Sequence, residues 1–158
     1  MPSIDTSDPA IKETWKAIND PDEIMGWALF GLEEDGRTLG VYKSGDGGYD
    51  EIMAALDDNR VLFGLLKVFA IDEKSDPPSR RARILFILWR GTGATAEQKF
   101  VAPMQRDDIL RLFPMVIDYD VTSREAFSRE AVIKRLVTYS GSKKPTHLEL
   151  GPTDLAEI

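Results

Sequence analysis

The chain has 158 residues, a formal net charge of −7, no cysteine and a single histidine. This length suits one domain with its own hydrophobic core, and 42% hydrophobic with 30% charged residues is typical of a globular protein. The composition excludes disulfides, zinc ribbons and thiol nucleophiles, and it leaves little material for histidine-based metal or catalytic sites. No apolar run approaches the ~18 residues of a membrane span and the start lacks a signal-peptide pattern, so we expect a cytoplasmic protein without a membrane span.

The first third of the chain predicts a helix, a β-hairpin and a second helix. Asp8 precedes segment 9–19, whose apolar residues recur at helical spacing. Segments 25–32 and 37–43 are apolar, and the Asp-Gly pair between them is typical of a hairpin turn. A glycine-rich loop then leads to a helix predicted over 49–58.

Two long apolar segments, 60–71 and 82–89, predict the centre of a sheet. Both are rich in Val, Ile, Leu and Phe, and neither alternates between apolar and polar residues. This pattern is typical of strands that are covered on both faces. A polar connector over 72–78 separates them.

The last third of the chain predicts two more helices around a short strand. A third helix follows the loop at 91–95 and runs to about Phe113, a strand covers 115–121, and Ser128 caps a helix over 129–139. Helices that cover both faces of a sheet predict an α+β protein with a three-layer α/β/α sandwich around a mixed sheet. From residue 142 the chain turns polar and loses periodicity. We therefore expect one domain over 1–141 and a flexible tail over 142–158.

Charge is distributed unevenly along the chain. Residues 1–58 carry 14 acids and 4 bases, whereas residues 59–158 carry 13 acids and 16 bases. The densest basic stretch, 79–90, contains arginines and no acid. The acidic net charge argues against a general nucleic-acid binder. The uneven distribution of charge along the chain either gives the folded protein a basic face for an acidic partner or only keeps the protein soluble.

The search for chemistry finds few candidates. No phosphate-binding loop is present. Asp118 and Asp120 share one face of a predicted strand and could serve acid–base catalysis or hold a cation, although a structural role is favoured. On the third helix, Met104, Asp107 and Arg111 fall opposite the core-facing residues. This outward side is either a protein-contact face or an ordinary i,i+4 ion pair of Asp107 with Arg111.

A colinear series of short motifs then resembles one family, the actin-depolymerising-factor homology (ADF-H) family, and within it the coactosin-like members. The resemblance extends from about residue 4 to residue 141. The motifs are Glu34-Asp35-Gly36-Arg37-Thr38, Tyr49-Asp50-Glu51, Arg60-Val61-Leu62-Phe63, Lys67-Val68-Phe69, Arg83 six residues before Trp89, and Lys99-Phe100-Val101 seven residues before Arg106-Asp107.

The resemblance implies a non-catalytic actin-binding module without a cofactor, with a gelsolin-like mixed sheet of about five to six strands between four main helices. It implies binding to the side of actin filaments, weak or no binding to monomeric actin, and a monomeric, cytoskeleton-associated protein. It assigns actin contacts to the strand before Trp89 and to the third helix. We expect the assigned residues to form one cationic ridge against the acidic actin surface: Arg80, Arg81, Arg83, Lys99, Met104, Arg106 and Arg111.

Two features depart from the family's pattern and several alternatives stay open. The third helix carries Pro103, and Asp108 stands where depolymerising members are usually neutral, so we expect weaker binding by that helix. Ser3 lies near the regulatory serine of depolymerising members without being assigned that role. One alternative is a factor that severs or depolymerises filaments and binds monomeric actin. Another is an adaptor with a degenerate actin face, and a third is a small-molecule binder or hydrolase that uses Asp118 and Asp120.

Overall fold

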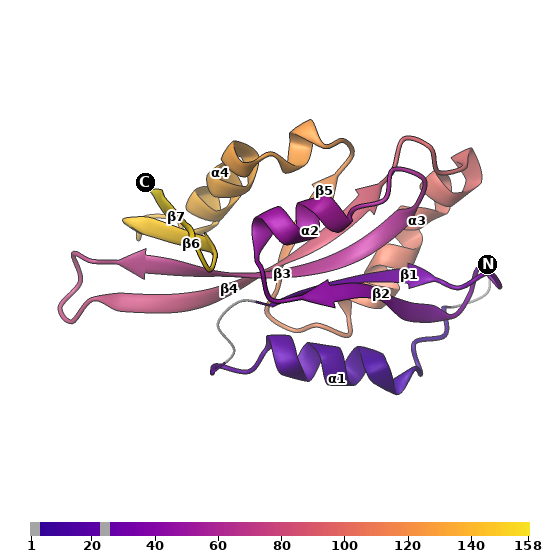
Figure 1. Ribbon diagram of the computed structural model, residues 1–158, viewed down its shortest axis with the longest axis horizontal. Helices are drawn as coiled ribbons and strands as arrows, with labels where there is room; N and C mark the ends of the chain where they lie inside the picture. Colours follow the sequence, from indigo (N-terminus) through magenta and orange to yellow (C-terminus); the bar gives the residue numbers. More distant parts are fainter. Residues whose placement is uncertain (1–3, 23–25) are drawn as a thin grey trace.

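The computed structural model describes residues 4–22 and 26–158. Within these residues the strands form one seven-stranded sheet (Figure 1). The strands are β1 (Trp27–Leu32), β2 (Leu39–Gly45), β3 (Val61–Asp72), β4 (Ser79–Arg90), β5 (Ile117–Val121), β6 (His147–Gly151) and β7 (Asp154–Glu157). They lie in the order β2-β1-β3-β4-β5, with β6 pairing with both β3 and β7. β4 and β5 are parallel and the other strand pairs of the described chain are antiparallel, so the sheet is mixed as predicted.

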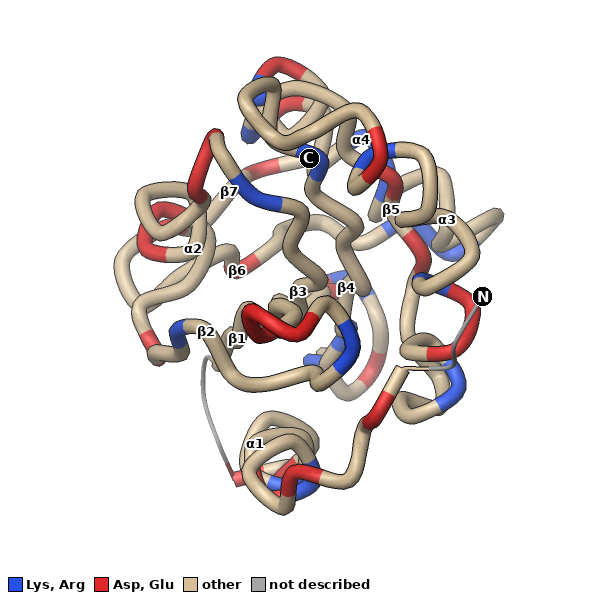
Figure 2. The backbone as a smooth tube through the Cα atoms, turned by 90° about the vertical axis from the view of Figure 1, so that its right-hand side faces the viewer, with Lys and Arg blue, Asp and Glu red and all other residues tan. Residues whose placement is uncertain are grey.

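Helices cover both faces of this sheet (Figures 1 and 2). They are α1 (Pro9–Ile18), α2 (Tyr49–Ala55), α3 (Ala96–Leu110) and α4 (Arg129–Tyr139), with a short 3-10 helix η1 (Glu125–Phe127) before α4. α1 and α3 bury apolar residues against one face, and α2 and α4 bury theirs against the other. The predicted three-layer α/β/α arrangement is therefore confirmed.

The central strands have no apolar/polar alternation because both of their faces are buried. In β3, Leu62 and Leu66 pack on the side of α2 and α4, whereas Phe63 and Leu65 pack on the side of α1 and α3. β4 begins at Ser79 rather than at the predicted Ala82, because its polar first residues still pair with the end of β3. The β3–β4 hairpin is thus longer than the apolar pattern alone indicated.

The predicted flexible tail is the clearest error of the sequence interpretation. Residues 142–158 contain β6 and β7, which form a hairpin, and β6 extends the sheet by pairing with Phe69–Ile71 of β3. Leu148, Leu150 and Ala156 are buried in the core on the α2/α4 face. The hairpin turn approaches Gly48 so closely that a Cβ there would lie 2.4 Å from the Gly151 Cα, and Gly48 has a φ of +79° that favours glycine. The tail therefore belongs to the fold and raises the strand number above the expected range.

A pair of tyrosines, Tyr49 of α2 and Tyr119 of β5, holds η1 in place. The Tyr49 hydroxyl donates to the Phe127 carbonyl at 2.6 Å, and the Tyr119 hydroxyl donates to the Ala126 carbonyl. Both rings also contact the Phe127 ring edge-on, with centroids 5.4 Å and 6.1 Å apart. Burial raises the pKa of both phenols above the ordinary value of 10.0.

These tyrosines predict a loss of stability at alkaline pH. Above pH 10 the phenols of the unfolded chain ionise first, so the folded state binds more protons and the free energy of unfolding falls as pH rises towards the raised pKa values. Replacing both hydroxyls, in Tyr49→Phe with Tyr119→Phe, is expected to lower stability by about 1 kcal/mol per hydrogen bond at neutral pH. The same variant is expected to show a shallower alkaline decline. Urea unfolding at pH 8 and above pH 10 measures both effects, and equal declines in parent and variant would contradict the assignment.

No helix of the described residues is long and apolar enough to cross a membrane.

Candidate functional site

The first residues of β4 form one wall of a basic cleft. Strand geometry places alternate residues on opposite faces, so Arg81 and Arg83 lie on the same face as the buried Leu85 and Ile87, on the side of α4. The cleft has a volume of about 1040 Å³, and its opposite wall is the segment that joins α4 to β6. That segment contributes Lys143 and Lys144, which the sequence interpretation had placed in the flexible tail.

The two arginines of the cleft have few partners among the described residues. The Arg83 Nη1 donates to the Ala82 carbonyl at 3.1 Å, while its Nε is buried and has no hydrogen-bond partner among the described residues. No ion pair of Arg81 is present in the part of the chain that the structure describes, and this side chain is exposed. Across the cleft, the Lys144 Nζ donates to the Val137 carbonyl at the end of α4, which holds this cation at the rim.

Arg80 does not join this cleft. It lies on the opposite face of β4, where its guanidinium stacks 3.6 Å from the Phe69 ring centroid and donates twice to the Glu149 carboxylate, at 2.9 Å and 3.1 Å. The hydrogen bond with Glu149 raises the pKa of Arg80 above its already high value. Because Glu149 belongs to β6, the contact fastens the C-terminal hairpin to the sheet. Arg80 therefore binds Glu149 within the protein and does not lie in a shared ridge with Arg81 and Arg83, as was expected.

The second group of expected residues lies on α3. A capping box starts this helix, since the Thr95 hydroxyl accepts from the Gln98 N–H and the Gln98 side chain accepts from the Thr95 N–H. Ala102 and Ile109 are buried against the sheet. The helix continues through Pro103, although proline removes the N–H that would have bonded to the Lys99 carbonyl.

Two large apolar side chains are exposed on the outward side of α3. Phe100 is 78% exposed and Met104 is 51% exposed, and their spacing of four residues places them on one face of the helix. Neighbouring exposed aromatic and methionine side chains are typical of protein-contact surfaces. The sequence interpretation assigned Met104 and used Phe100 only as a family landmark. In the sequence, the position of Phe100 directly after the basic Lys99 was the signal that could have marked Phe100 as a contact residue.

The cations of α3 are largely paired within the molecule. Arg106 forms ion pairs with Asp118 of β5 and, at 2.8 Å, with Asp107. Arg111 is 78% exposed at its side chain and lies 3.4 Å from Asp108. The alternative of an ion pair between Asp107 and Arg111 is therefore wrong, because both partners bind closer neighbours. The Lys99 Nζ donates to the Thr92 carbonyl at 3.1 Å in the loop before the helix.

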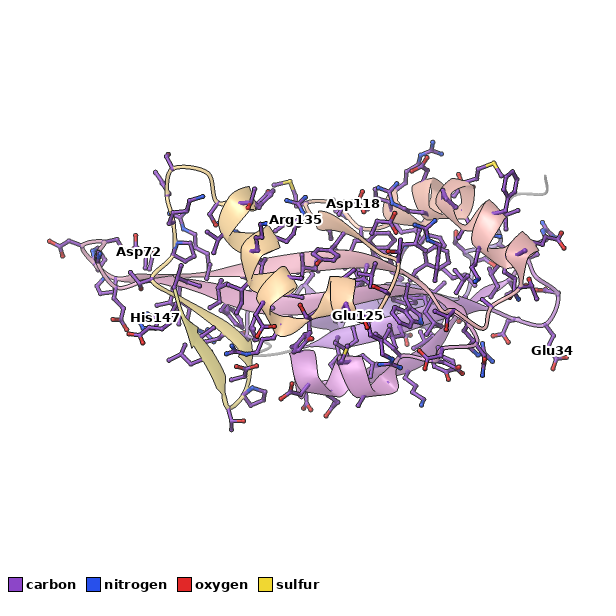
Figure 3. All side chains as sticks on the ribbon, turned by 90° about the horizontal axis from the view of Figure 1, so that it is seen from above. Glu34, Asp72, Asp118, Glu125, Arg135 and His147 are labelled. Atoms are coloured by element: carbon purple, nitrogen blue, oxygen red, sulfur yellow. The ribbon has the colours of Figure 1, made fainter. Side chains whose placement is uncertain are left out.

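The expected single cationic ridge is wrong, since its residues occupy two separate surfaces. The cleft, marked by Asp72, and α3 lie in opposite halves of the molecule along its long axis (Figures 1 and 3). They also lie on opposite faces of the sheet. Figure 2 shows the end remote from the cleft, where acidic positions follow α2 and the turn between β1 and β2.

The carboxylates of β5 are engaged in ion pairs. Asp118 binds Arg106, and Asp120 lies 2.8 Å from an Nη of Arg90. A hydrolase or cation site built on these acids needs free carboxylate oxygens, which these contacts occupy. Among the described residues no group of three His, Cys, Asp or Glu side chains is arranged to hold a metal ion.

This arrangement of a mixed sheet, a long exposed helix and a basic strand end has relatives among known proteins. A family model described as "Cofilin/tropomyosin-type actin-binding protein" matches residues 3–137, and the chain belongs to this family of non-catalytic actin-binding domains. Its coactosin-like character is supported by coactosin of Entamoeba histolytica, which is 31% identical over 78 residues, 49% of this chain and 50% of that protein.

Further relatives differ in length or only share the fold. Protein app1 of Schizosaccharomyces pombe is 27% identical over 141 residues, covering 87% of this chain and 15% of app1. The chain thus spans half or less of these curated relatives. The crystal structure of the Entamoeba coactosin matches with a TM-score of 0.71 at 20% identity, over 86% of this chain and 96% of that one. Mouse coactosin, described as an actin filament binding protein, matches with a TM-score of 0.64 at 13% identity, over 89% and 93%.

Proposed function

We propose that this protein binds the side of actin filaments through two surfaces, the basic cleft and the exposed stripe of α3. The observation that carries the proposal is the cleft, in which Arg81 and Arg83 face Lys143 and Lys144 and the buried Nε of Arg83 has no partner among the described residues. A negatively charged surface supplies carboxylates for the accessible donors of these side chains, and arginine pairs with carboxylates in a fixed geometry.

The α3 stripe gives the second contact. Phe100 and Met104 present an apolar surface, and Arg111, which pairs with Asp108, is exposed at the end of the same helix. Aromatic and methionine side chains that become buried on binding contribute strongly to affinity, whereas charges steer association. We therefore expect the apolar contact on α3 to provide most of the affinity and the charged cleft to provide an electrostatic contact.

A filament, rather than a single actin molecule, explains why the two surfaces lie so far apart. Because they occupy opposite halves and opposite faces of the domain, they are suited to neighbouring subunits of a polymer. This proposal includes weak or no binding to monomeric actin, a monomeric protein, and a location with the cytoskeleton in the cytoplasm. It also follows the description of mouse coactosin as a filament binder.

Co-sedimentation with actin filaments tests the proposal. We expect the protein to pellet with filaments at low salt and less at moderate salt, because screening weakens the contact at the cleft. Light scattering of the same filaments is expected to stay constant. A rapid loss of scattering would instead support a severing or depolymerising factor, and no pelleting at any salt concentration would support an adaptor with a degenerate actin face.

A further inference from the structure

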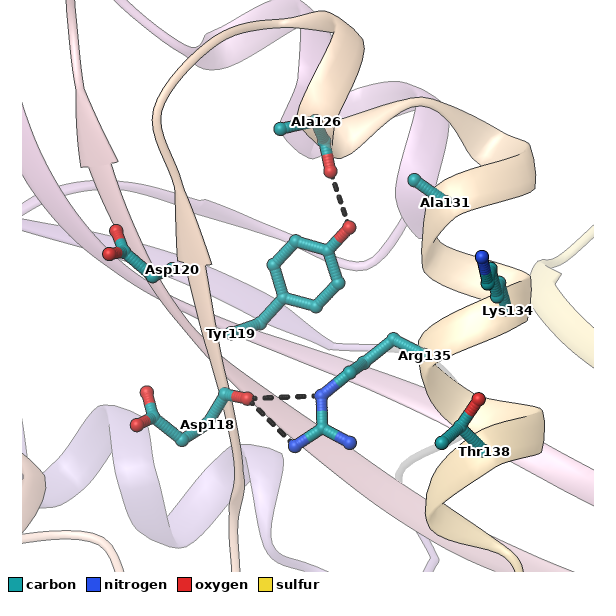
Figure 4. Close-up of a pocket in the computed structure, with 8 residues that line it drawn as sticks. All are labelled: Asp118, Tyr119, Asp120, Ala126, Ala131, Lys134, Arg135 and Thr138. Carbon is teal, nitrogen blue, oxygen red and sulfur yellow. Dashed lines mark hydrogen bonds between the residues drawn. The ribbon is translucent and has the colours of Figure 1, made fainter.

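The basic cleft takes its cations from separate parts of the chain. Its arginines belong to β4, whereas Lys143 and Lys144 belong to the segment that joins α4 to β6. One end of this segment is fixed because α4 is tied to β5, where the Arg135 Nε and Nη2 donate to the Asp118 carbonyl at 3.4 Å and 3.2 Å (Figure 4). The position of the two lysines therefore depends on how firmly β6 is held at the other end.

β6 is joined to the sheet by a short pairing. It pairs with Phe69–Ile71 of β3, whereas β3 and β4 pair along their whole length. The Thr146 N–H and hydroxyl extend this attachment, since both donate to the Ile71 carbonyl, at 2.7 Å and 3.1 Å. A two-stranded hairpin is marginally stable on its own, so its contacts with the rest of the protein decide where β6 and β7 lie.

Arg80 holds β6 from the side of the sheet that faces α1 and α3. Its side chain crosses β3, where the guanidinium lies 3.6 Å from the Phe69 ring centroid, and it donates two hydrogen bonds to the Glu149 carboxylate, at 2.9 Å and 3.1 Å. The side chains of this pair are 44% and 25% exposed, so solvent screens it less than a fully exposed ion pair. A bidentate contact stacked on an aromatic ring is stronger than an ordinary surface ion pair. Arg80 thus links β4, β3 and β6.

We propose that Arg80 is a positioning residue for filament binding, which holds β6 through Glu149 and thereby keeps Lys143 and Lys144 at the cleft. Its effect on binding rests on the proposed function of the cleft. Arg80 lies on the opposite face of the sheet from the cleft, so it acts through the hairpin and not through the filament. The family resemblance instead gives Arg80 a direct actin contact. The two roles make opposite predictions for Glu149, because a direct contact gains from the loss of a nearby acid, whereas positioning requires that acid.

Two neutral variants decide between these roles. Arg80→Met and Glu149→Met each remove the ion pair, keep a long side chain beside Phe69 and change the net charge in opposite directions. Both are expected to weaken filament binding by about threefold or more in co-sedimentation at low salt. The double variant is expected to bind like each single variant, because both substitutions break the same contact. Parent-like or tighter binding of Glu149→Met, or losses that multiply in the double variant, would overturn the inference.

Hydrogen exchange of the isolated protein tests the hairpin without actin. Backbone amides of 146–149 are expected to exchange about threefold or more faster in both variants, since opening of β6 becomes easier. Arg90→Met is the matched control, because it breaks the 2.8 Å ion pair with Asp120 at the other end of β4. This control is expected to leave exchange at 146–149 and pelleting unchanged.

Unchanged exchange in Arg80→Met, or an equal loss of pelleting in Arg90→Met, would contradict the role of Arg80. If the parent itself does not pellet, the proposed function fails, and the exchange measurement then decides separately whether Arg80 holds the hairpin.

Discussion

Reversal of both cleft arginines, in Arg81→Glu with Arg83→Glu, is expected to reduce filament binding by about 100-fold in co-sedimentation. The change places carboxylates against an acidic surface, so attraction is replaced by repulsion. The fold is expected to remain, because Arg81 is exposed and Arg83 hydrogen-bonds only to the neighbouring Ala82 carbonyl among the described residues. Because the variant also removes salt-sensitive contacts, its residual binding is expected to depend less on salt than that of the parent.

A matched control separates the position of the charge from its amount. Lys12→Glu with Lys16→Glu makes the same change in net charge on α1, at exposed residues on the other face of the sheet. This control is expected to pellet nearly like the parent. Equal losses in both variants would show that overall charge governs pelleting, and parent-like pelleting of the arginine variant with a normal unfolding curve would refute the cleft assignment.

Truncation of the apolar stripe, in Phe100→Ala with Met104→Ala, is expected to weaken filament binding by about 10- to 100-fold. Both side chains are largely exposed in the isolated protein, so their removal costs little stability. On binding they become buried, and truncation of such an anchor costs about 1–3 kcal/mol. Co-sedimentation at several salt concentrations is the measurement. Here the salt dependence is expected to match that of the parent, because no charge is changed.

Met115→Ala is the matched control for this second variant. Met115 is 94% exposed but lies in the loop between α3 and β5, outside the stripe. Its truncation is expected to leave pelleting unchanged. If it weakens pelleting as much as the stripe variant does, the apolar contact is not specific to α3, and if the stripe variant pellets like the parent, α3 is not a filament contact.

The three arginines at the start of β4 show how much of the site could be predicted from sequence. The period of two in a strand separates Arg80 from Arg81 and Arg83 as soon as the strand is known to reach that far. The apolar pattern began the strand at residue 82, which left Arg80 and Arg81 outside it, so the face of each arginine was not distinguished and all three were grouped as one cluster. β4 pairs with the end of β3 on one edge of that strand, and β6 pairs with β3 on the other edge. These pairings bring Arg80 to Glu149, whereas Arg81 and Arg83 face the cleft.

The third helix shows a similar limit. Helical periodicity correctly placed Ile109 and Phe113 towards the core and Met104 and Arg111 outwards. It could not predict that Arg106 binds Asp118, because Asp118 follows after a turn and its position depends on how β5 packs beside β4. The same limit explains why the alternative ion pair of Asp107 with Arg111 does not form, since competition between neighbouring carboxylates depends on side-chain geometry.

The sequence by itself determined the layers of this protein, most of its helices and strands, and its family, because these follow from the local spacing of apolar residues and from short motifs in a fixed order. The positions of the charges relative to one another were decided by the tertiary structure alone. The C-terminal hairpin has little sequence periodicity, but β6 pairs with β3, and Lys143 and Lys144 before it therefore line the cleft. Long-range pairing sets the face on which each arginine lies. For that reason the expected ridge became two surfaces at opposite ends of one domain.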